Sequence, residues 1–169
     1  LCTDGGGPGE LMVQRLLQLH PEKPIFPTSR YEFKKYSEKG GYLVPFENVK
    51  KRINSGNNCP IKIKRIFFSS AKKDSFRGDH AHKLCSQLLL CVSGSIKIEK
   101  IFHIKRKKTY FISRNKNYAL LLPPLVWSRI YFKSKKSLLV VICDYKYDNK
   151  NEYINNFRQF INISKKKFI

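Results

Sequence analysis

The stretch Arg77-Gly78-Asp79-His80-Ala81-His82 carries two histidines at alternate positions, and Gln87 and Gly94 follow at spacings of five and seven residues. Residues two apart on a β-strand project from the same face, so we expect His80 and His82 to point together. Two imidazoles on one face suit either two ligands of one metal or a pair acting on one substrate. The alternative is a histidine pair that is simply packed within a strand.

Short apolar segments separated by turns lie on both sides of the histidine pair. We expect strands at Pro60–Ser69, Leu88–Val92, Ile96–Ile98, Thr109–Ser113, Tyr118–Leu122 and Ser137–Tyr145. We expect turns at Ser93-Gly94-Ser95, Lys105–Lys108 and Arg114–Asn117. Many short strands without helices between them predict an all-β barrel or sandwich.

The C-terminal part of the chain has a different period. From Asp148 onward the apolar residues have the spacing of one helical face, at Tyr153, Ile154, Phe157, Phe160 and Ile161. Asp148 or Asn149 would be the N-cap, because short polar side chains accept hydrogen bonds from the first free amides of a helix. We therefore predict a short C-terminal helix that closes one end of the barrel.

The composition changes near residue 30. Residues 1–30 hold three basic and three acidic side chains, so the whole formal charge of +22 lies in residues 31–169. The first segment also contains a glycine-rich run, Gly5–Gly9, that lacks the pattern of a phosphate-binding loop. We interpret residues 1–30 as foreign in composition (a fusion scar, a truncated upstream domain or a mis-set start) and 31–169 as the folded domain.

The charge of +22 first suggests nucleic acid or another anionic surface as partner. The basic residues are mostly lysines, however, and they are enriched together with isoleucine and asparagine, as an A/T-rich coding sequence would produce. The chain has no zinc-finger spacing and no aromatic RNA-binding signature. We therefore expect no nucleic-acid partner, and some attraction for anionic ligands.

The cysteines and the apolar runs indicate the cellular compartment of the protein. The five cysteines are odd in number and form no CxxC pair, and Cys91 and Cys143 lie in apolar runs, where buried free thiols are common. No apolar run approaches the roughly 18 residues of a membrane span, and the N-terminus does not read as a signal peptide. We expect a protein of the reducing cytoplasm that does not span a membrane.

The spacing around the histidines resembles the first cupin motif, in which His-x-His precedes a carboxylate and a turn glycine. The stretch Pro123–Ser128 resembles the second cupin motif in outline. Gln87 stands at the place of the motif's glutamate, and Ser128 at the place of its second histidine. Because two imidazoles are fewer ligands than a transition metal needs, we expect no metal or other cofactor, and an acid–base role for the histidines.

Residues 77–83 and 87–95 also resemble the signature of the sugar 3,4-ketoisomerases, the FdtA/QdtA/WxcM-like cupins. The resemblance continues backward through residues 63–68 and forward through 122–127 and 144–160. It implies a cupin jelly-roll barrel and a metal-independent isomerisation of a dTDP-linked 4-keto-6-deoxyhexose to its 3-keto isomer. It further implies a place in 3-amino-sugar synthesis for surface polysaccharide such as lipopolysaccharide O-antigen, and a homodimer with exchanged N-terminal strands.

The same resemblance implies roles for single residues. His80 would be the base that takes the C3 proton, and His82 would be its partner in shuttling protons or polarising the keto oxygen. Beside these roles we take Arg77, Gln87, Phe68, Trp127 and Ser128 as candidate substrate-binding residues. Arg77 could instead hold the turn of the strand, and a tryptophan such as Trp127 is more often wall or core than ligand. Phe67 or Phe68 stands where relatives commonly have a tyrosine.

Two other classes of function stay open on the sequence. One is a metal-dependent cupin, or a relative with different sugar chemistry. The other is a non-catalytic module, either a degenerate cupin that holds a sugar nucleotide or a basic nucleic-acid binder.

Overall fold

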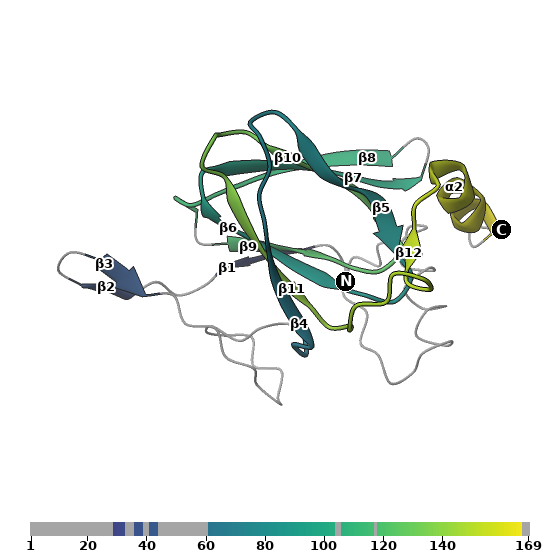
Figure 1. Ribbon diagram of the computed structural model, residues 1–169, viewed down its shortest axis with the longest axis horizontal. Coiled ribbons are helices and arrows are strands. Elements are labelled where there is room, and N and C mark those ends of the chain that lie inside the picture. Colours follow the sequence, from purple (N-terminus) through teal and green to yellow (C-terminus); the bar gives the residue numbers. More distant parts are fainter. Residues whose placement is uncertain are drawn as a thin grey trace, which may run out of the picture.

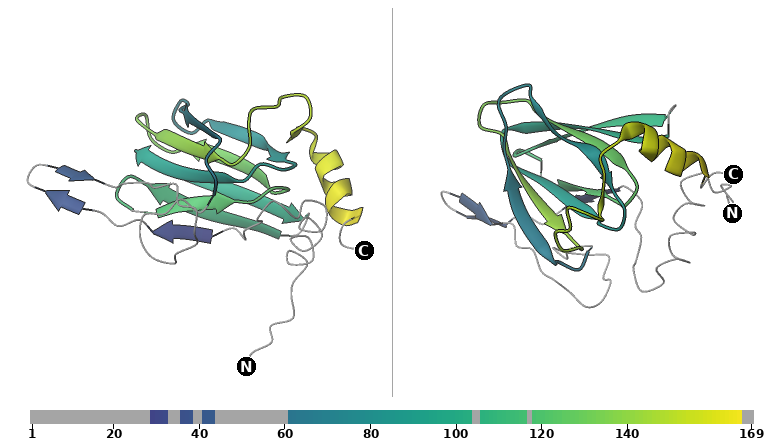
Figure 2. Two further views of the ribbon diagram at one scale, coloured as in Figure 1. Left: turned by 90° about the horizontal axis from the view of Figure 1, so that it is seen from below. Right: turned by 45° about the vertical axis from the view of Figure 1, so that its right-hand side comes forward.

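The computed structural model describes residues 29–32, 36–38, 41–43, 61–103, 106–116 and 118–166. They form two five-stranded antiparallel sheets that lie face to face, with one helix beside one end (Figure 1; Figure 2). The first sheet has the strand order β1 (Ser29–Glu32), β9 (Tyr118–Leu122), β6 (Gln87–Ser93), β11 (Leu138–Cys143) and β4 (Arg65–Ser69). The second has the order β12 (Tyr153–Ile154), β5 (Phe76–His82), β10 (Trp127–Phe132), β7 (Ser95–His103) and β8 (Arg106–Ser113).

Two further elements lie outside these sheets. A separate two-stranded sheet, β2 (Tyr36–Glu38) with β3 (Gly41–Leu43), projects from the barrel in Figure 1. The helix α2 spans Phe157–Lys166. The predicted all-β barrel with a short C-terminal helix is confirmed.

The interior of the barrel is apolar at one end and polar at the other. On neighbouring strands β10 and β7, the inward pairs are Phe132 with Ile96, Ile130 with Ile98, and Ser128 with Lys100. The four apolar members of these pairs belong to the main core, which also takes residues from the first sheet, among them Leu89, Leu120 and Leu139. The third pair begins the polar end, and the histidines of β5 lie there as well.

The hinge between β6 and β7 is confirmed at Gly94. Its φ of 69° is a left-handed conformation that favours glycine. A Cβ atom there would also lie 2.7 Å from Ser137 Oγ and would collide with Ser134 Oγ. Glycine is therefore needed both for the turn and for the close approach of the neighbouring loop.

Two predicted boundaries are wrong. The strand predicted from Pro60 begins only at Arg65 in the described residues. The turn predicted at Lys105–Lys108 is instead largely the start of β8, whose Lys107 and Lys108 pair with β7. A strand can carry this charge because Lys107 points outward, where its Nζ lies 2.8 Å from Glu99 Oε2.

The strand β10 was not among the predicted strands. Its two faces are Trp127, Arg129 and Tyr131 on one side and Ser128, Ile130 and Phe132 on the other. Each face mixes polar and apolar residues, so the alternation that marks a half-buried strand is absent.

The C-terminal helix starts later than predicted. Asn156 is its N-cap, with the side-chain oxygen 3.0 Å from the amide nitrogen of Gln159. Asp148 instead accepts amide hydrogens from Lys150 and Asn151 in a tight turn. Tyr153 and Ile154 are not helical, because they pair with His82 and Ala81 as strand β12.

Two further predictions concern the first residues of the chain and the state of the cysteines. Strand β1 begins at Ser29 in the described residues, and the segment predicted to be foreign lies almost wholly in residues 1–28, outside the described part. Cys91 and Cys143 are buried free thiols, as predicted, and so is Cys85.

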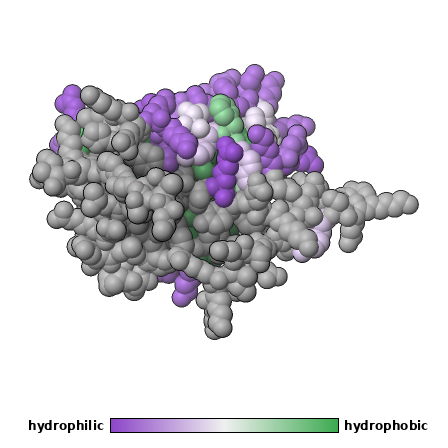
Figure 3. All heavy atoms as spheres, turned by 180° about the vertical axis from the view of Figure 1, so that it is seen from behind, coloured by the Kyte–Doolittle hydropathy of each residue, from purple (hydrophilic) through white to green (hydrophobic). Residues whose placement is uncertain are grey.

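No helix among the described residues is long and apolar enough to cross a membrane. Seen from behind, the described surface along the top of the molecule is mainly hydrophilic (Figure 3).

Candidate active site

Strand β5 brings the two histidines to the polar end of the barrel. Ala81 packs beneath α2 on the outer face with Trp127 and Phe160, so His80 and His82 face inward. Gly78 precedes them with a φ of 81°, and a Cβ there would lie 2.9 Å from the carbonyl oxygen of Ser128. The close approach of β5 to β10 at this bulge therefore requires glycine.

The two imidazole rings are in direct contact. His80 Nε2 lies 3.2 Å from His82 Nε2, and the ring planes are nearly perpendicular at 77°. His80 Nδ1 lies 3.1 Å from the carbonyl oxygen of Gly78, which can only accept a hydrogen bond. Nδ1 therefore carries the proton of a neutral His80, and Nε2 carries the lone pair that can accept another.

His80 is held in its neutral form. Burial, together with the nearby charge of His82, lowers the pKa of His80 to about 4. At neutral pH this imidazole is therefore a base ready to take a proton, not an acid.

Glu152 supports His82 from the opposite side. Its Oε1 lies 3.7 Å from His82 Nδ1 and accepts the amide hydrogens of Leu84 and Cys85 at 2.9 and 2.6 Å. Burial would raise the pKa of Glu152, but the nearby His82 imidazole and the hydrogen bonds from the two amides outweigh it and lower the pKa. The ionised carboxylate thus fixes the orientation of His82 and stabilises positive charge on it.

Gln87 contacts the same histidine. Its side-chain amide nitrogen lies 3.1 Å from His82 Nε2. The amide can present either its nitrogen or its oxygen after a flip, so it can follow a change of proton on His82. The structure thus brings three predicted site residues together, because His80 and Gln87 both contact His82 at Nε2.

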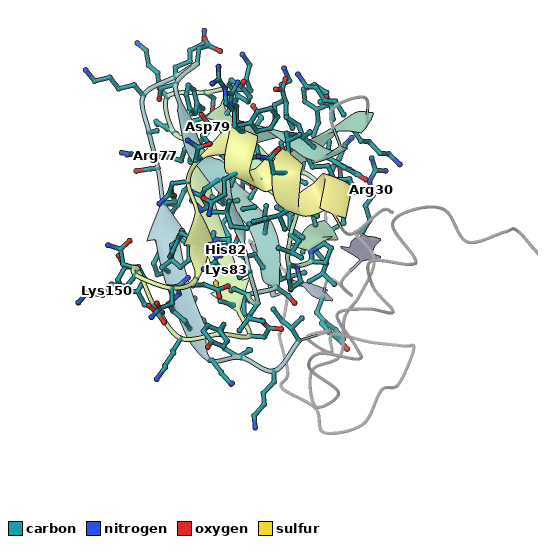
Figure 4. All side chains as sticks on the ribbon, turned by 90° about the vertical axis from the view of Figure 1, so that its right-hand side faces the viewer. Arg30, Arg77, Asp79, His82, Lys83 and Lys150 are labelled. Carbon is teal, nitrogen blue, oxygen red and sulfur yellow. The ribbon has the colours of Figure 1, made fainter. Side chains whose placement is uncertain are left out.

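The second predicted motif lies against β5. The amide of Leu125 donates to the carbonyl oxygen of His82 at 2.7 Å, and Ser128 pairs in register with His80. Ser128 is buried and points inward, so it lies beside the histidines as the sequence predicts. Arg77 is an exposed residue further along β5, as Figure 4 shows.

Two predicted substrate-binding residues lie away from the histidines. Trp127 is on the outer face of β10, where its Nε1 donates to Asp79 at 2.9 Å and its ring packs on Phe157 and Phe160 of α2. Phe68 is 70% exposed on the outer face of β4, whereas Phe67 packs against the core. Each is one residue out of register with the inward face, so the structure does not bring either side chain beside the histidines.

Two residues at the site were missed by the sequence reasoning. Tyr153 pairs with His82, and its ring centroid lies 5.0 and 4.6 Å from those of His80 and His82. Arg65 interacts electrostatically with Tyr153, and its Nη2 donates to Cys143 Sγ at 3.5 Å. The alternation of β4, with Arg65 and Phe67 on one face, was the available signal for Arg65.

The thiols of Cys85 and Cys143 form a second buried contact beside Arg65. The interaction with Cys85 and the charge of Arg65 outweigh burial, and they lower the pKa of Cys143 to about 7. The pKa of Cys85 is raised by the same contact.

One group in the described part of the chain has the composition of a metal site. The ligand atoms of His82, Cys85 and Glu152 all lie within 4.8 Å of one another. Only His82 belongs to the cupin motif, and the Glu152 oxygen already accepts two backbone amides. These contacts suit an oriented imidazole better than a metal centre.

Known proteins are similar to this chain in sequence and in fold. The family model FdtA, described as WxcM-like, C-terminal, matches residues 28–165. The TDP-4-oxo-6-deoxy-alpha-D-glucose-3,4-oxoisomerase of Aneurinibacillus thermoaerophilus is 29% identical over 133 residues, which cover 76% of this chain and 88% of that protein.

Two solved structures are also similar to this chain. QdtA, a sugar 3,4-ketoisomerase from Thermoanaerobacterium thermosaccharolyticum in complex with TDP, is 29% identical with a TM-score of 0.72, covering 84% of this chain and 97% of that one. WlaRA, the TDP-fucose-3,4-ketoisomerase from Campylobacter jejuni, is 28% identical with a TM-score of 0.68, covering 82% and 96%.

The family match spans both sheets. It begins one residue before β1 and ends within α2, so it includes every strand of the barrel and the histidine pair. The resemblance read from the sequence is confirmed. This chain belongs to the FdtA family, described as WxcM-like, C-terminal.

Proposed function

We propose that this protein is an isomerase that moves the ketone of a TDP-linked 4-keto-6-deoxyhexose from C4 to C3. The observation that carries the proposal is the contact between His80 Nε2 and His82 Nε2 at 3.2 Å, beside a neutral His80. The named activities of the relatives from Aneurinibacillus and Thermoanaerobacterium support the substrate class.

The chemistry follows from the acidity of a C–H bond next to a ketone. A neutral imidazole can remove the C3 proton if the developing enolate is stabilised, and return of a proton to C4 completes the move. We assign removal of the C3 proton to His80. His82, oriented by Glu152 and in contact with His80, shares the proton with it.

We assign residues to parts of the substrate by their positions in the barrel. Gln87 and Ser128 line the inward face beside the histidines, and we assign them to the sugar. Arg77 is exposed on the same strand and suits the diphosphate. A 3-keto sugar is the form that an aminotransferase would convert to a 3-amino sugar, which fits a role in surface polysaccharide synthesis. The three buried free thiols fit the reducing cytoplasm.

Incubation of the protein with TDP-4-keto-6-deoxyglucose in deuterated water tests the activity. Deuterium from the solvent is expected at C3 of the substrate and C4 of the product, because both proton transfers pass through exchangeable imidazoles. Proton NMR of the sugar follows both positions and the 3-keto product. An absence of exchange at every protein concentration would contradict the isomerase.

We further infer a homodimer. The outer face of the sheet that contains β4, β11 and β6 exposes large apolar side chains, with Ile66 at 53%, Phe68 at 70% and Val92 at 43% exposure. An apolar sheet face of this kind is more typical of a subunit interface than of a free surface.

A glutamate at position 68 is expected to weaken the dimer by about tenfold or more, since loss of a large apolar contact at an interface centre costs about 2 kcal/mol. Analytical ultracentrifugation of Phe68→Glu measures the change. The matched control is Phe111→Glu, because Phe111 is 57% exposed but lies on the other sheet. Equal behaviour of the two variants would place the interface elsewhere.

A further inference from the structure

Lys100 is a buried cation on the inward face of β7. Ile96 and Ile98 precede it on the same face and belong to the core. The intervening Glu99 points outward, where it is bound by Lys97 at 2.7 Å. Lys100 is only 3% exposed, so the alternation of the strand carries its side chain into the barrel.

The register places Lys100 at the same level as the histidine pair. Ser128 on β10 pairs with Lys100 on one side and with His80 on the other. With strands about 4.8 Å apart, the backbone of Lys100 lies about 10 Å from that of His80, across the small side chain of Ser128. A substrate lying over Ser128 would have the imidazole on one side and the lysine on the other.

The surroundings of Lys100 adjust its proton affinity. Burial, and then the charge of Lys108, lower the pKa of Lys100 to about 7. The Nζ atoms of both lysines lie 5.4 Å from the ring centroid of Tyr110. At neutral pH this amine can therefore both donate and accept a proton.

We propose that Lys100 is a further catalytic residue, which exchanges protons with the two sugar oxygens while the histidines exchange them with the two carbons. The proposal rests on the proposed ketoisomerase activity. It accounts for a step that the histidine pair leaves open, because the ketone cannot move unless the proton on the C3 hydroxyl moves to the C4 oxygen.

The step balances within the substrate and the protein. His80 takes the proton from C3, the C–H electron pair forms the C3–C4 double bond, and the Lys100 ammonium protonates the C4 oxygen. The neutral Lys100 then takes the proton of the C3 hydroxyl as the C3 carbonyl forms. The proton held by the imidazoles goes to C4, and both groups return to their starting forms.

A methionine at position 100 tests the proposal, since it keeps the length and the apolar stem but not the amine. We expect kcat of Lys100→Met for TDP-4-keto-6-deoxyglucose to fall about 10²- to 10³-fold, the usual effect of removing one donor to a developing oxyanion. The dissociation constant for TDP, measured by calorimetry, is expected to stay unchanged. The matched control is Lys97→Met on the outward face of the same strand, which should keep the wild-type rate.

The pH profile separates a catalytic from a structural role. Among the described residues, the titratable groups that face Lys100 include Lys108 and Tyr110 on β8 and, across Ser128, His80 and His82 on β5. The wild-type kcat should fall above the pKa of Lys100, about 7, because the ammonium is the form that protonates the oxygen. Lys100→Met should lose this basic limb, and Lys100→Arg should move it to higher pH.

The possible results of these experiments distinguish the role of Lys100 from the isomerase activity. A wild-type kcat for Lys100→Met, or a loss confined to TDP binding, would overturn the role of Lys100 while leaving the isomerase standing. A wild-type protein without any exchange would overturn the isomerase itself. If Lys100→Met does not fold, ¹³C NMR of labelled lysine in the wild type replaces it, and a Lys100 resonance unaffected by the substrate would overturn the proposal.

Discussion

Replacement of His80 by asparagine is expected to abolish deuterium exchange at C3 and to lower kcat about 10³-fold or more, the effect of losing a general base. Asparagine can still donate a hydrogen bond to the Gly78 carbonyl in place of Nδ1, which lies 3.1 Å from that oxygen. It lacks the Nε2 atom that receives the proton. The variant should therefore fold normally and lose the chemistry.

Binding and stability measurements provide the control for this variant. His80→Asn should bind TDP with the wild-type affinity and unfold at the wild-type temperature, since asparagine keeps the hydrogen bond to the Gly78 carbonyl oxygen. The pH profile of the wild type adds an independent check. Because burial and His82 lower the pKa of His80 to about 4, the base stays neutral down to about that pH, and the acid limb of kcat should lie near 4. An acid limb near 6.5, or exchange by His80→Asn at the wild-type rate, would assign the base to another group.

The histidine pair could be predicted from the sequence because its geometry is local. Alternation alone directs His80 and His82 to one face, and the contact with Gln87 follows from the next strand of the same motif. The metal-free interpretation rested on Gln87 and Ser128, and the structure places both beside the histidines.

The sequence is least informative where a shift of one residue decides which face of a strand a side chain occupies. Trp127 and Phe68 were candidates for the site, but both lie on outer faces, and the sequence does not show this because β10 and β4 carry large apolar residues on both sides. The packing of α2 on Trp127 fixes the face of β10, and that contact joins residues far apart in the chain.

Glu152 and Lys100, which lie around the histidine pair, differ in whether a pattern in the sequence could have predicted them. Glu152 reaches His82 from a segment that the apolar spacing assigned to a helix, so no local pattern could have found it. Lys100 was within reach of a pattern, because it continues the face of Ile96 and Ile98, but the charged run Lys97–Lys100 reads as a solvated strand.

Glu152 gives the second large expected effect. Alanine at this position should lower the free energy of unfolding by about 2–4 kcal/mol, because it leaves buried amides without an acceptor and removes the charge facing His82. The amides are those of Leu84 and Cys85, and the Glu152 side chain is only 4% exposed. Urea unfolding measures the loss, and kcat should fall with it.

Glutamine separates the two roles of this side chain. Glu152→Gln keeps an oxygen for the two amides, so it should retain most of the stability, but it lacks the charge that orients His82 and should still lower kcat. The pKa of Glu152 is lowered in the folded state, so the charge stabilises the protein above the unfolded value of about 4.5, and this contribution disappears as pH falls through the folded pKa. The stability difference between wild type and Glu152→Gln should therefore shrink at acidic pH. A constant difference, or a Glu152→Gln enzyme with the wild-type kcat, would show that the carboxylate acts only as a hydrogen-bond acceptor for the backbone.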